Sequence, residues 1–442
     1  LAAERLLSRV INISINGSDL ILDRVFVKIG FNQIEDIVFR QLVKARLAYP
    51  ASKAATVEYL KNHFDEDVSL SKIYRYLDKL SDSQHEIVQD ISVLHTKRVQ
   101  DDRLGVLFYD VTTLYFEADY EDELRKTGFS KEGRHKNPQV ILGLLVSAGG
   151  YPLAYCIHEG NKHEGHTMLP VVTEFVWKYK LEDFIMVADS GLMNGDNISD
   201  LEANGYKYII GAKIKNESRK IQEWILKQPK IDRRMVEYDK GDGQRLLVGY
   251  TDDRARKDAC NRDKGIRRLE KAYSRGVLTK DNINKRGYNK FLKMEGDVRV
   301  SINYEKLEAD SKWDGLKGYL TNTNIPAGDV YVAYHNLWHV ERAFRISKSK
   351  IEIRPMFHFT PRRIEAHVCI CFVALKVYKE LERLLKLSNI NMSVDKVLAL
   401  AQTIVTIQIE LPLNKQILTK TMLMKRHQRI APLFTDDFWV TR

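Results

Sequence analysis

Two short apolar runs constrain the fold of this chain most strongly, because each reads as a buried strand and each ends in an aspartate. Val106–Tyr109 is followed directly by Asp110, and Phe184–Ala188 is followed directly by Asp189. Continuous apolar runs of this length are typical of strands covered on both faces. A helical pattern at Thr167–Tyr179 lies between them. Helices that alternate with buried strands predict an α/β core that begins near residue 104.

An uncharged segment, Pro138–Ile157, reaches the roughly 20 residues that a membrane-spanning helix needs. Gly149-Gly150-Tyr151-Pro152 interrupts this segment with residues typical of a tight turn. We therefore expect two buried strands joined as a hairpin, and no membrane span.

The first hundred residues have a helical pattern. Apolar residues recur at helical spacing in Ile34–Leu47, Val57–Phe64 and Ile73–Leu80, and Ser69 is placed to cap the last of these helices. Two short helices joined by a tight turn would form a helix-turn-helix. Its DNA-facing side chains would be Lys72, Arg75 and Lys79. A small helical bundle with a solvated charged face fits the same pattern.

Regular alternation stops between residues 213 and 326, where short strand patterns and a basic helical run predict a β-rich insertion. One helix is then expected from Val330 to Ser347, followed by a long amphipathic helix at Pro361–Leu387 and another at Val394–Ile407. The expected division is a helical candidate DNA-binding domain (1–103), the first part of the core (104–212), the basic insertion (213–326), the second part of the core (327–387) and a C-terminal helical region (388–442).

Positive charge is concentrated in two places. The chain has 70 Lys and Arg against 59 Asp and Glu, a formal net charge of +11. Arg254–Arg299 and Glu341–Arg363 together carry more than this whole excess. Localised basic charge in a globular protein indicates a phosphate-rich partner, and nucleic acid first.

The four cysteines do not form a disulfide-like pattern, and no signal peptide is visible. We therefore expect a cytoplasmic protein. Cys369 and Cys371 lie in an apolar run without zinc-ligand spacing, so we expect them to be buried.

The aspartates at the predicted strand ends are candidates for metal chemistry. Ligand sites of open α/β sheets lie at strand ends, and an ionised carboxylate beside an apolar run needs compensation. Hard carboxylate oxygens suit Mg²⁺ and Mn²⁺, and two such ions can drive in-line phosphoryl displacement. Strand-end aspartates also often do no more than cap turns, and spacing alone does not separate these readings.

A third block of residues resolves the choice by resemblance. Tyr109-Asp110-Val111-Thr112-Thr113-Leu114, Val187-Ala188-Asp189-Ser190-Gly191 and the stretch from Tyr334 to Lys348 resemble, in the same order, the DDE transposases of bacterial insertion sequences. The branch with a β-rich insertion carries the signature Tyr-x2-Arg-x3-Glu-x6-Lys. Tyr334, Glu341 and Lys348 match it, but the arginine position is Leu337.

The resemblance implies a ribonuclease-H-like core in which Asp110, Asp189 and Glu341 bind two Mg²⁺ ions, for which Mn²⁺ can substitute. In that fold the first two acids lie on strands and the glutamate lies on a helix after the insertion. Lys348 would contact a phosphate near the cleavage site, and Tyr334 a phosphate of the transposon end. On one helix, both would share the face of Glu341, two turns away on either side.

Further residues are expected around this site. Arg342 and Arg345 are candidates to replace the missing arginine, and Trp338 is expected either to stack on a displaced base or to pack in the core. Asn161 and His163 are expected next to the metal ligands or the DNA, or else in a solvated loop. The insertion would either follow end DNA or present a merely solubilising face through Arg267, Arg268, Lys271, Lys285, Arg286 and Lys290.

The expected function is that of a transposase. It would hydrolyse a phosphodiester at each element end and join the freed 3′-hydroxyl to target DNA, through a hairpin and a cut-and-paste route. Its partners would be the terminal inverted repeats, target DNA and a second copy of the chain, in a bacterial cytoplasm and on the nucleoid when bound to DNA. The alternatives are a nuclease of the same fold that does not join ends, and a domesticated DNA-binding protein without catalysis.

Overall fold

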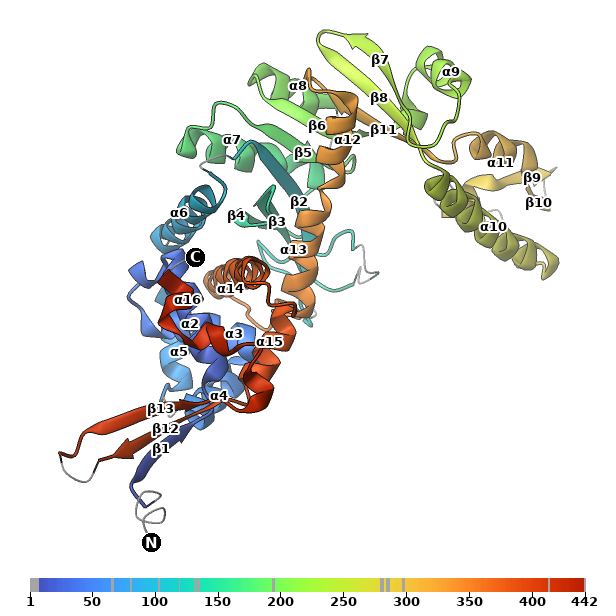
Figure 1. Cartoon of the computed structure of the whole chain (residues 1–442). Helices are drawn as coiled ribbons and strands as arrows, with labels where there is room; N and C mark the ends of the chain where they lie inside the picture. The colour runs from blue at the N-terminus through green and yellow to red at the C-terminus, as the bar shows by residue number, and fades with distance from the viewer. Residues whose placement is uncertain are drawn as a thin grey trace. The chain divides into compact units, whose positions relative to one another are not determined.

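The structure is a computed structural model that describes residues 8–64, 67–79, 82–101, 104–118, 120–130, 133, 136–192, 195–278, 282–283, 287–295, 299–411 and 414–440 (Figure 1). The chain forms two compact units, Leu1–Phe184 with Leu337–Arg442, and Ile185–Asn336. None of the helices within the described ranges combines the length and the apolar character needed to cross a membrane.

The larger strands of the first unit, in the order β4-β3-β2, pair antiparallel with one another. They are β2 (Val106–Tyr115), β3 (Gln139–Ser147) and β4 (Pro152–Glu159). Every residue of β3 is buried, as expected for the uncharged segment, and the predicted hairpin is confirmed. The expectation that the first strand ends at Asp110 is wrong, because the β-branched residues Val111, Thr112 and Thr113 continue β2.

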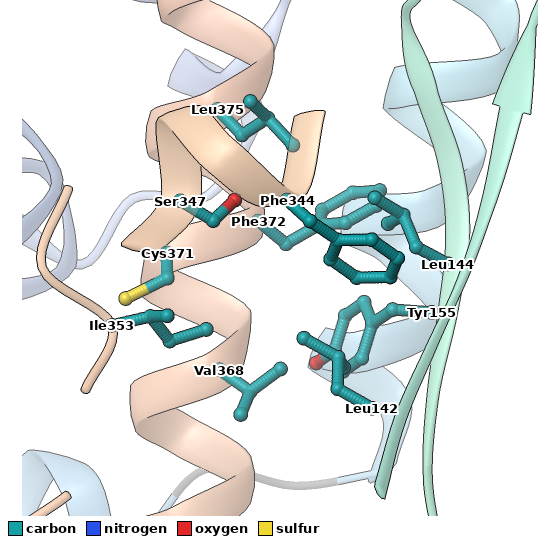
Figure 2. A pocket seen from close by; sticks show the side chains of 10 residues that line it. All are labelled: Leu142, Leu144, Tyr155, Phe344, Ser347, Ile353, Val368, Cys371, Phe372 and Leu375. Carbon is teal, nitrogen blue, oxygen red and sulfur yellow. The ribbon is translucent and has the colours of Figure 1, made fainter. Parts of the chain in front are cut away.

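Two helices cover this sheet. The helix α13 (Trp338–Ser349) contacts β2 and β3, and α14 (Pro361–Leu387) contacts β4. Figure 2 shows Phe344 of α13 and Val368 and Phe372 of α14 opposite Leu142, Leu144 and Tyr155 of the strands. Thr360 caps α14 by accepting a hydrogen bond from the Arg363 amide, and Pro361 begins the helix, where its missing N–H costs nothing. Most of α14 is buried, including Cys369 and Cys371 as predicted.

The N-terminal helices pack around α14. They are α2 (Gly17–Ile29), α3 (Ile37–Ala48), α4 (Lys53–Phe64), α5 (Leu70–Lys79) and α6 (Asp82–Val99). Helices α2, α3, α5 and α6 contact α14 directly, and α6 also contacts β4. Ser69 caps α5, whose Ile73, Tyr76 and Leu77 are buried as the pattern predicts. Another helix of this unit, α7 (Met168–Tyr179), follows β4 in the chain.

The C-terminal region is part strand. The helix predicted to continue to Ile407 ends with α15 (Val394–Ala401), and β12 (Val405–Glu410) follows. Alternating Val405, Ile407 and Ile409 favour a strand, and β12 pairs with β1 (Val10–Ser14) and β13 (Ile417–Met422). The purely helical expectation for this region is therefore wrong. A short helix, α16 (Asp436–Val440), follows the small sheet.

The second unit contains a five-stranded sheet in the order β5-β6-β11-β8-β7. Its strands are β5 (Ile185–Ala188), β6 (Lys207–Ala212), β7 (Met235–Gly241), β8 (Gln244–Tyr250) and β11 (Leu316–Thr321). The β5–β6 pair is parallel, and the other pairs are antiparallel. Three helices pack against the strands of this sheet: α8 (Gly195–Ala203), α9 (Arg219–Lys227) and α12 (Ala327–His335).

A small subdomain follows β8. It contains α10 (Asp252–Ser274), η5 (Gly287–Phe291), β9 (Leu292–Glu295), β10 (Arg299–Ile302) and α11 (Tyr304–Ser311). Leu269, Phe291, Leu292, Val300 and Ile302 form its own core. The stretch expected as a β-rich insertion thus contains helices as well as strands, while the chain as a whole has the predicted α/β architecture.

Candidate active site

Asp110 lies in the middle of β2, opposite Leu144 of β3. Its neighbours Tyr109 and Val111 are buried, whereas Asp110 itself is half-buried. Its Oδ1 accepts a hydrogen bond from the Val111 amide at 2.8 Å. A carboxylate in this position is anchored by well-packed backbone on both sides, so its location is fixed by the strand.

Glu341 lies on the exposed face of α13, in the same unit as Asp110. The opposite face of the helix is buried through Val340, Ala343 and Phe344. The rings of Phe108 and His339 lie 6.1 Å apart, which places the start of α13 beside β2. Because alternate residues of a strand share a face, Phe108 and Asp110 project to the same side of β2. The start of α13, where Glu341 comes two residues after His339, therefore packs on the side of β2 to which Asp110 projects.

Asp189, in the second unit, comes directly after β5, as predicted, and its side chain is exposed. The Tyr334 hydroxyl donates a hydrogen bond of 2.7 Å to Asp189 Oδ1. Gly211 of β6 lies beneath this pair. A Cβ at Gly211 would lie 2.6 Å from the Tyr334 oxygen and 3.3 Å from Asp189 Oδ1. The hydrogen bond therefore requires a glycine at residue 211.

Lys317 of β11 completes the surroundings of Asp189. Its ammonium lies 5.1 Å from the centre of the Tyr334 ring. Burial lowers the pKa of Lys317, and the negative charge of Asp189 opposes this shift while Arg254 adds to it. Tyr319 packs edge-on against Tyr334 at 4.9 Å. Asp189 is thus neighboured by a hydroxyl donor and a cation.

Tyr334 and Glu341 do not lie on one helix, so the expectation of a single helix from 330 to 347 is wrong. Tyr334 belongs to α12 and Glu341 to α13. At the junction the Asn336 amide still bonds to Val332, whereas the Val340 amide bonds to Leu337, a tighter three-residue spacing. The boundary between the two units falls between Asn336 and Leu337.

The three acids supply oxygen donors of the type that Mg²⁺ and Mn²⁺ prefer. Among the residues that the structure describes, no three His, Cys, Asp or Glu side chains form a group that could hold a metal ion. Asp110 and Glu341 belong to one unit and Asp189 to the other.

The sequence comparison identifies the family. The model of the transposase DDE domain matches residues 103–376, which is more than half of the chain. The chain belongs to the DDE transposase family. The matched region contains all three predicted acids and the Tyr334–Lys348 block, so the resemblance seen in the sequence is confirmed.

Other comparisons add little to this assignment. No curated protein is significantly similar in sequence. A structure of the piggyBac transposase synaptic complex with hairpin DNA is 9% identical, with a TM-score of 0.45, over 86% of this chain and 70% of that chain. The Mos1 transposase paired-end complex with left transposon end is 12% identical, with a TM-score of 0.18, over 36% of this chain and 58% of that chain. Likenesses at this level carry no argument about this DDE transposase.

The family signature of this transposase departs from the pattern at Leu337, which is only 6% exposed. An apolar side chain at the arginine position has therefore joined the core. Arg342, a candidate replacement, forms an ion pair with Glu382 of α14 and lies 5.8 Å from the Trp338 ring centre. Arg345 is exposed, and Lys348 is half-buried on the same helix.

Trp338 is 44% exposed and stacks on His339, with ring centres 4.1 Å apart. Burial lowers the pKa of His339 to about 4, with help from the charges of Lys379 and Arg342. His339 and Arg342 both lie against the Trp338 ring, and part of the ring is exposed to solvent, so base stacking stays a prediction.

The remaining predicted residues lie in two further places. Asn161 and His163 are exposed in the turn after β4, where His163 Nδ1 accepts a hydrogen bond from the Gly165 amide and caps η2 (Glu164–His166). Their role next to the metal ligands stays a prediction.

In the insertion, Arg267, Arg268 and Lys271 lie on the exposed face of α10. Lys290 pairs with Asp310 at 3.2 Å and lies over the Phe291 ring. Lys285 and Arg286 lie outside the described residues. DNA binding by this set stays a prediction.

Lys317 and Gly211 are site residues that the sequence interpretation missed. Both lie on strands that contribute no family signature, and their relevance comes from the pairing of β11 with β6. A glycine within an apolar strand, as in Ile209-Ile210-Gly211, is the one local signal of a close approach.

Proposed function

We propose that this DDE transposase cleaves insertion-sequence ends by metal-dependent hydrolysis of a phosphodiester and joins the freed 3′-hydroxyl to target DNA. The observation that carries the proposal is the position of the three acids inside the family domain: one on a strand, one directly after a strand and one on a helix that follows the insertion. This is the order in which a ribonuclease-H-like core presents its carboxylates.

Asp110, Asp189 and Glu341 would hold two Mg²⁺ ions, or Mn²⁺ in their place. When bound, such ions activate the attacking oxygen and stabilise the leaving oxygen. Tyr334 orients Asp189 by donating to its Oδ1. Lys348 presents a positive charge on α13, and we propose that it neutralises a phosphate oxygen near the cleavage site.

The DNA partners would be the terminal inverted repeats and target DNA, handled by at least two copies of the chain. The exposed Arg267, Arg268 and Lys271 of α10 would follow the end DNA by contacts with phosphates. A cut-and-paste route through a hairpin belongs to this proposal, as does a bacterial cytoplasm with association to the nucleoid.

The test is cleavage and strand transfer with duplexes that carry the element's own ends, in Mg²⁺. Asp110→Asn, Asp189→Asn and Glu341→Gln should each abolish cleavage, by at least about a thousandfold, and leave DNA binding intact, because each removes a charge without changing shape. Asp329→Asn, on the exposed surface of α12, is the matched control. Wild-type cleavage by any of the three would disprove the triad.

Two results would lead to different functions. Cleavage without joining of a pre-cut end would identify a nuclease of the same family. DNA binding without any metal-dependent cleavage by the wild-type chain would identify a protein that has lost catalysis.

A further inference from the structure

A cavity of about 220 Å³ in the first unit is lined by an unusual concentration of cationic side chains. It lies where the end of α3 and the start of α4 meet the segment between α13 and α14. The basic and imidazole groups that line it are Arg46, Lys53, Arg354, His358 and His367. None of the predicted metal-binding acids lines this cavity.

Two of these cations are buried without a counter-charge. Arg46 is 8% exposed and Lys53 is 5% exposed. Neither forms a hydrogen bond or an ion pair with any residue in the part of the chain that the structure describes. The acid that lines the cavity, Glu352, is itself exposed to solvent. Buried charges in proteins are normally paired, because desolvation of an unpaired ion is costly.

The two histidines face the same charges. The rings of His358 and His367 lie 5.2 Å apart. His367 Nε2 lies 3.2 Å from the Ile353 carbonyl and donates to it, while His367 Nδ1 is buried and has no partner among the described residues. Burial, with repulsion from Lys53, Arg46 and neighbouring positive charge, lowers the pKa of both imidazoles.

The start of α4 adds to the positive potential. The cavity is lined here by Ala51, Ser52, Lys53 and Ala54. The Ser52 Oγ accepts a hydrogen bond from the Ala55 amide at the start of the helix. The N-terminus of a helix of this length favours an anion through its backbone dipole. The cavity is therefore bounded by buried cations, a buried imidazole nitrogen without a partner and a helix N-terminus.

We propose that this cavity is a binding site for a phosphate group, held by Arg46, Lys53 and the two histidines. A phosphate offers several oxygens to donors that converge from different directions, and its negative charge offsets the positive charge of the two unpaired cations. With the anion bound, His367 can take a proton on Nδ1 and donate to it. The site holds whether or not the proposed transposition chemistry is correct.

The phosphate can come from a DNA strand or from a free phosphate-bearing molecule. Glu341–Arg363, which contributes one wall, carries a surplus of positive charge. The exposed ring of Phe357 at the cavity is a surface on which a base can stack. These features favour a DNA strand, and this assignment alone rests on the proposed function.

The test is calorimetric titration of the full chain with inorganic phosphate, at constant ionic strength and pH 7. Lys53→Met should weaken phosphate binding at least tenfold and should raise the melting temperature in chloride buffer, since it removes an uncompensated buried charge. Lys61→Met, on an exposed face of the same helix α4, should change neither value. No binding by the wild-type chain, or equal binding by Lys53→Met, would overturn the proposal.

A measurement on the wild-type chain covers the case in which Lys53→Met does not fold. Phosphate should raise the protonation midpoints of His358 and His367 by NMR, and unchanged midpoints would equally overturn the site. The titration is then repeated with saturating end duplex and without divalent metal. Competition assigns the site to a DNA phosphate, and undiminished phosphate binding assigns it to a free phosphate-bearing molecule. Because no cleavage is involved, an inactive enzyme leaves this result readable.

Discussion

The hydrogen bond from Tyr334 to Asp189 leads to a specific prediction about metal dependence. Tyr334→Phe removes the hydroxyl and keeps the ring that packs against Tyr319. A hydrogen bond to a charged acceptor contributes about 1.5–3 kcal/mol. Asp189 is exposed, so we expect a smaller contribution, about 1–2 kcal/mol, or roughly a 5- to 30-fold effect.

The effect should appear in the Mg²⁺ requirement. Without the hydroxyl, the Asp189 carboxylate rotates more freely. The binding of the ion then has to supply the free energy that orders this carboxylate. Single-turnover cleavage of an end duplex, measured over a range of Mg²⁺ concentrations, should therefore show a higher half-saturating concentration for Tyr334→Phe. The affinity for end DNA without metal should be little changed.

Tyr331→Phe is the matched control, because Tyr331 also packs edge-on against Tyr319 and lies on the same helix. Wild-type Mg²⁺ dependence in Tyr334→Phe would refute the positioning role. Weaker DNA binding at an unchanged Mg²⁺ requirement would show that the hydroxyl acts on the DNA phosphate instead, as the family resemblance alone predicts.

Three further variants test the packing around the site and the core. Gly211→Ala should displace Tyr334, destabilise the fold by about 1–3 kcal/mol and reproduce the raised Mg²⁺ requirement, whereas Gly195→Ala, which has open space for a Cβ, should not. Leu337→Arg should not restore a DNA contact but should lower the free energy of unfolding by about 2–5 kcal/mol, because residue 337 is buried; a stable variant that binds end DNA more tightly would contradict this. Burial lowers the pKa of His95 to about 4, so the unfolded chain takes up its proton first as the pH falls below 6.5. Stability should therefore drop by up to about 2 kcal/mol between pH 7 and pH 5 in urea titrations, and His95→Gln should remove this part of the loss.

Much of the fold could be predicted because it depends on local pattern. In the uncharged segment Pro138–Ile157, the turn residues Gly149-Gly150-Tyr151-Pro152 predict the hairpin of β3 and β4. Ser69 in the same way predicts the start of α5, which it caps. The end of β2 differs from the prediction at Asp110, because the β-branched residues after this aspartate extend the strand. At Val405 the strand depends on pairing with β1, which lies nearly the whole length of the chain away.

The candidate site was predictable to the extent that it lies in family blocks. These blocks alone predict Asp110, Asp189 and Glu341 as site residues, and their role as metal ligands stays a prediction. Lys317 and Gly211 could not be found, because their relation to Asp189 arises only when β11 pairs with β6. Pairing between strands that are distant in sequence leaves no periodic signal in either strand.

The break at Asn336–Leu337 changes how the Tyr334–Lys348 signature is understood. In sequence it is one motif on one expected helix. In the structure, Tyr334 belongs to α12 and acts within its own unit, where it bonds to Asp189. Glu341 and Lys348 belong to α13, which packs in the unit that contains Asp110. The motif therefore consists of two halves, each associated with a different aspartate. A buried leucine at the first residue of the second half fits this division, because Leu337 anchors the start of α13 in its own core rather than extending the surface of α12.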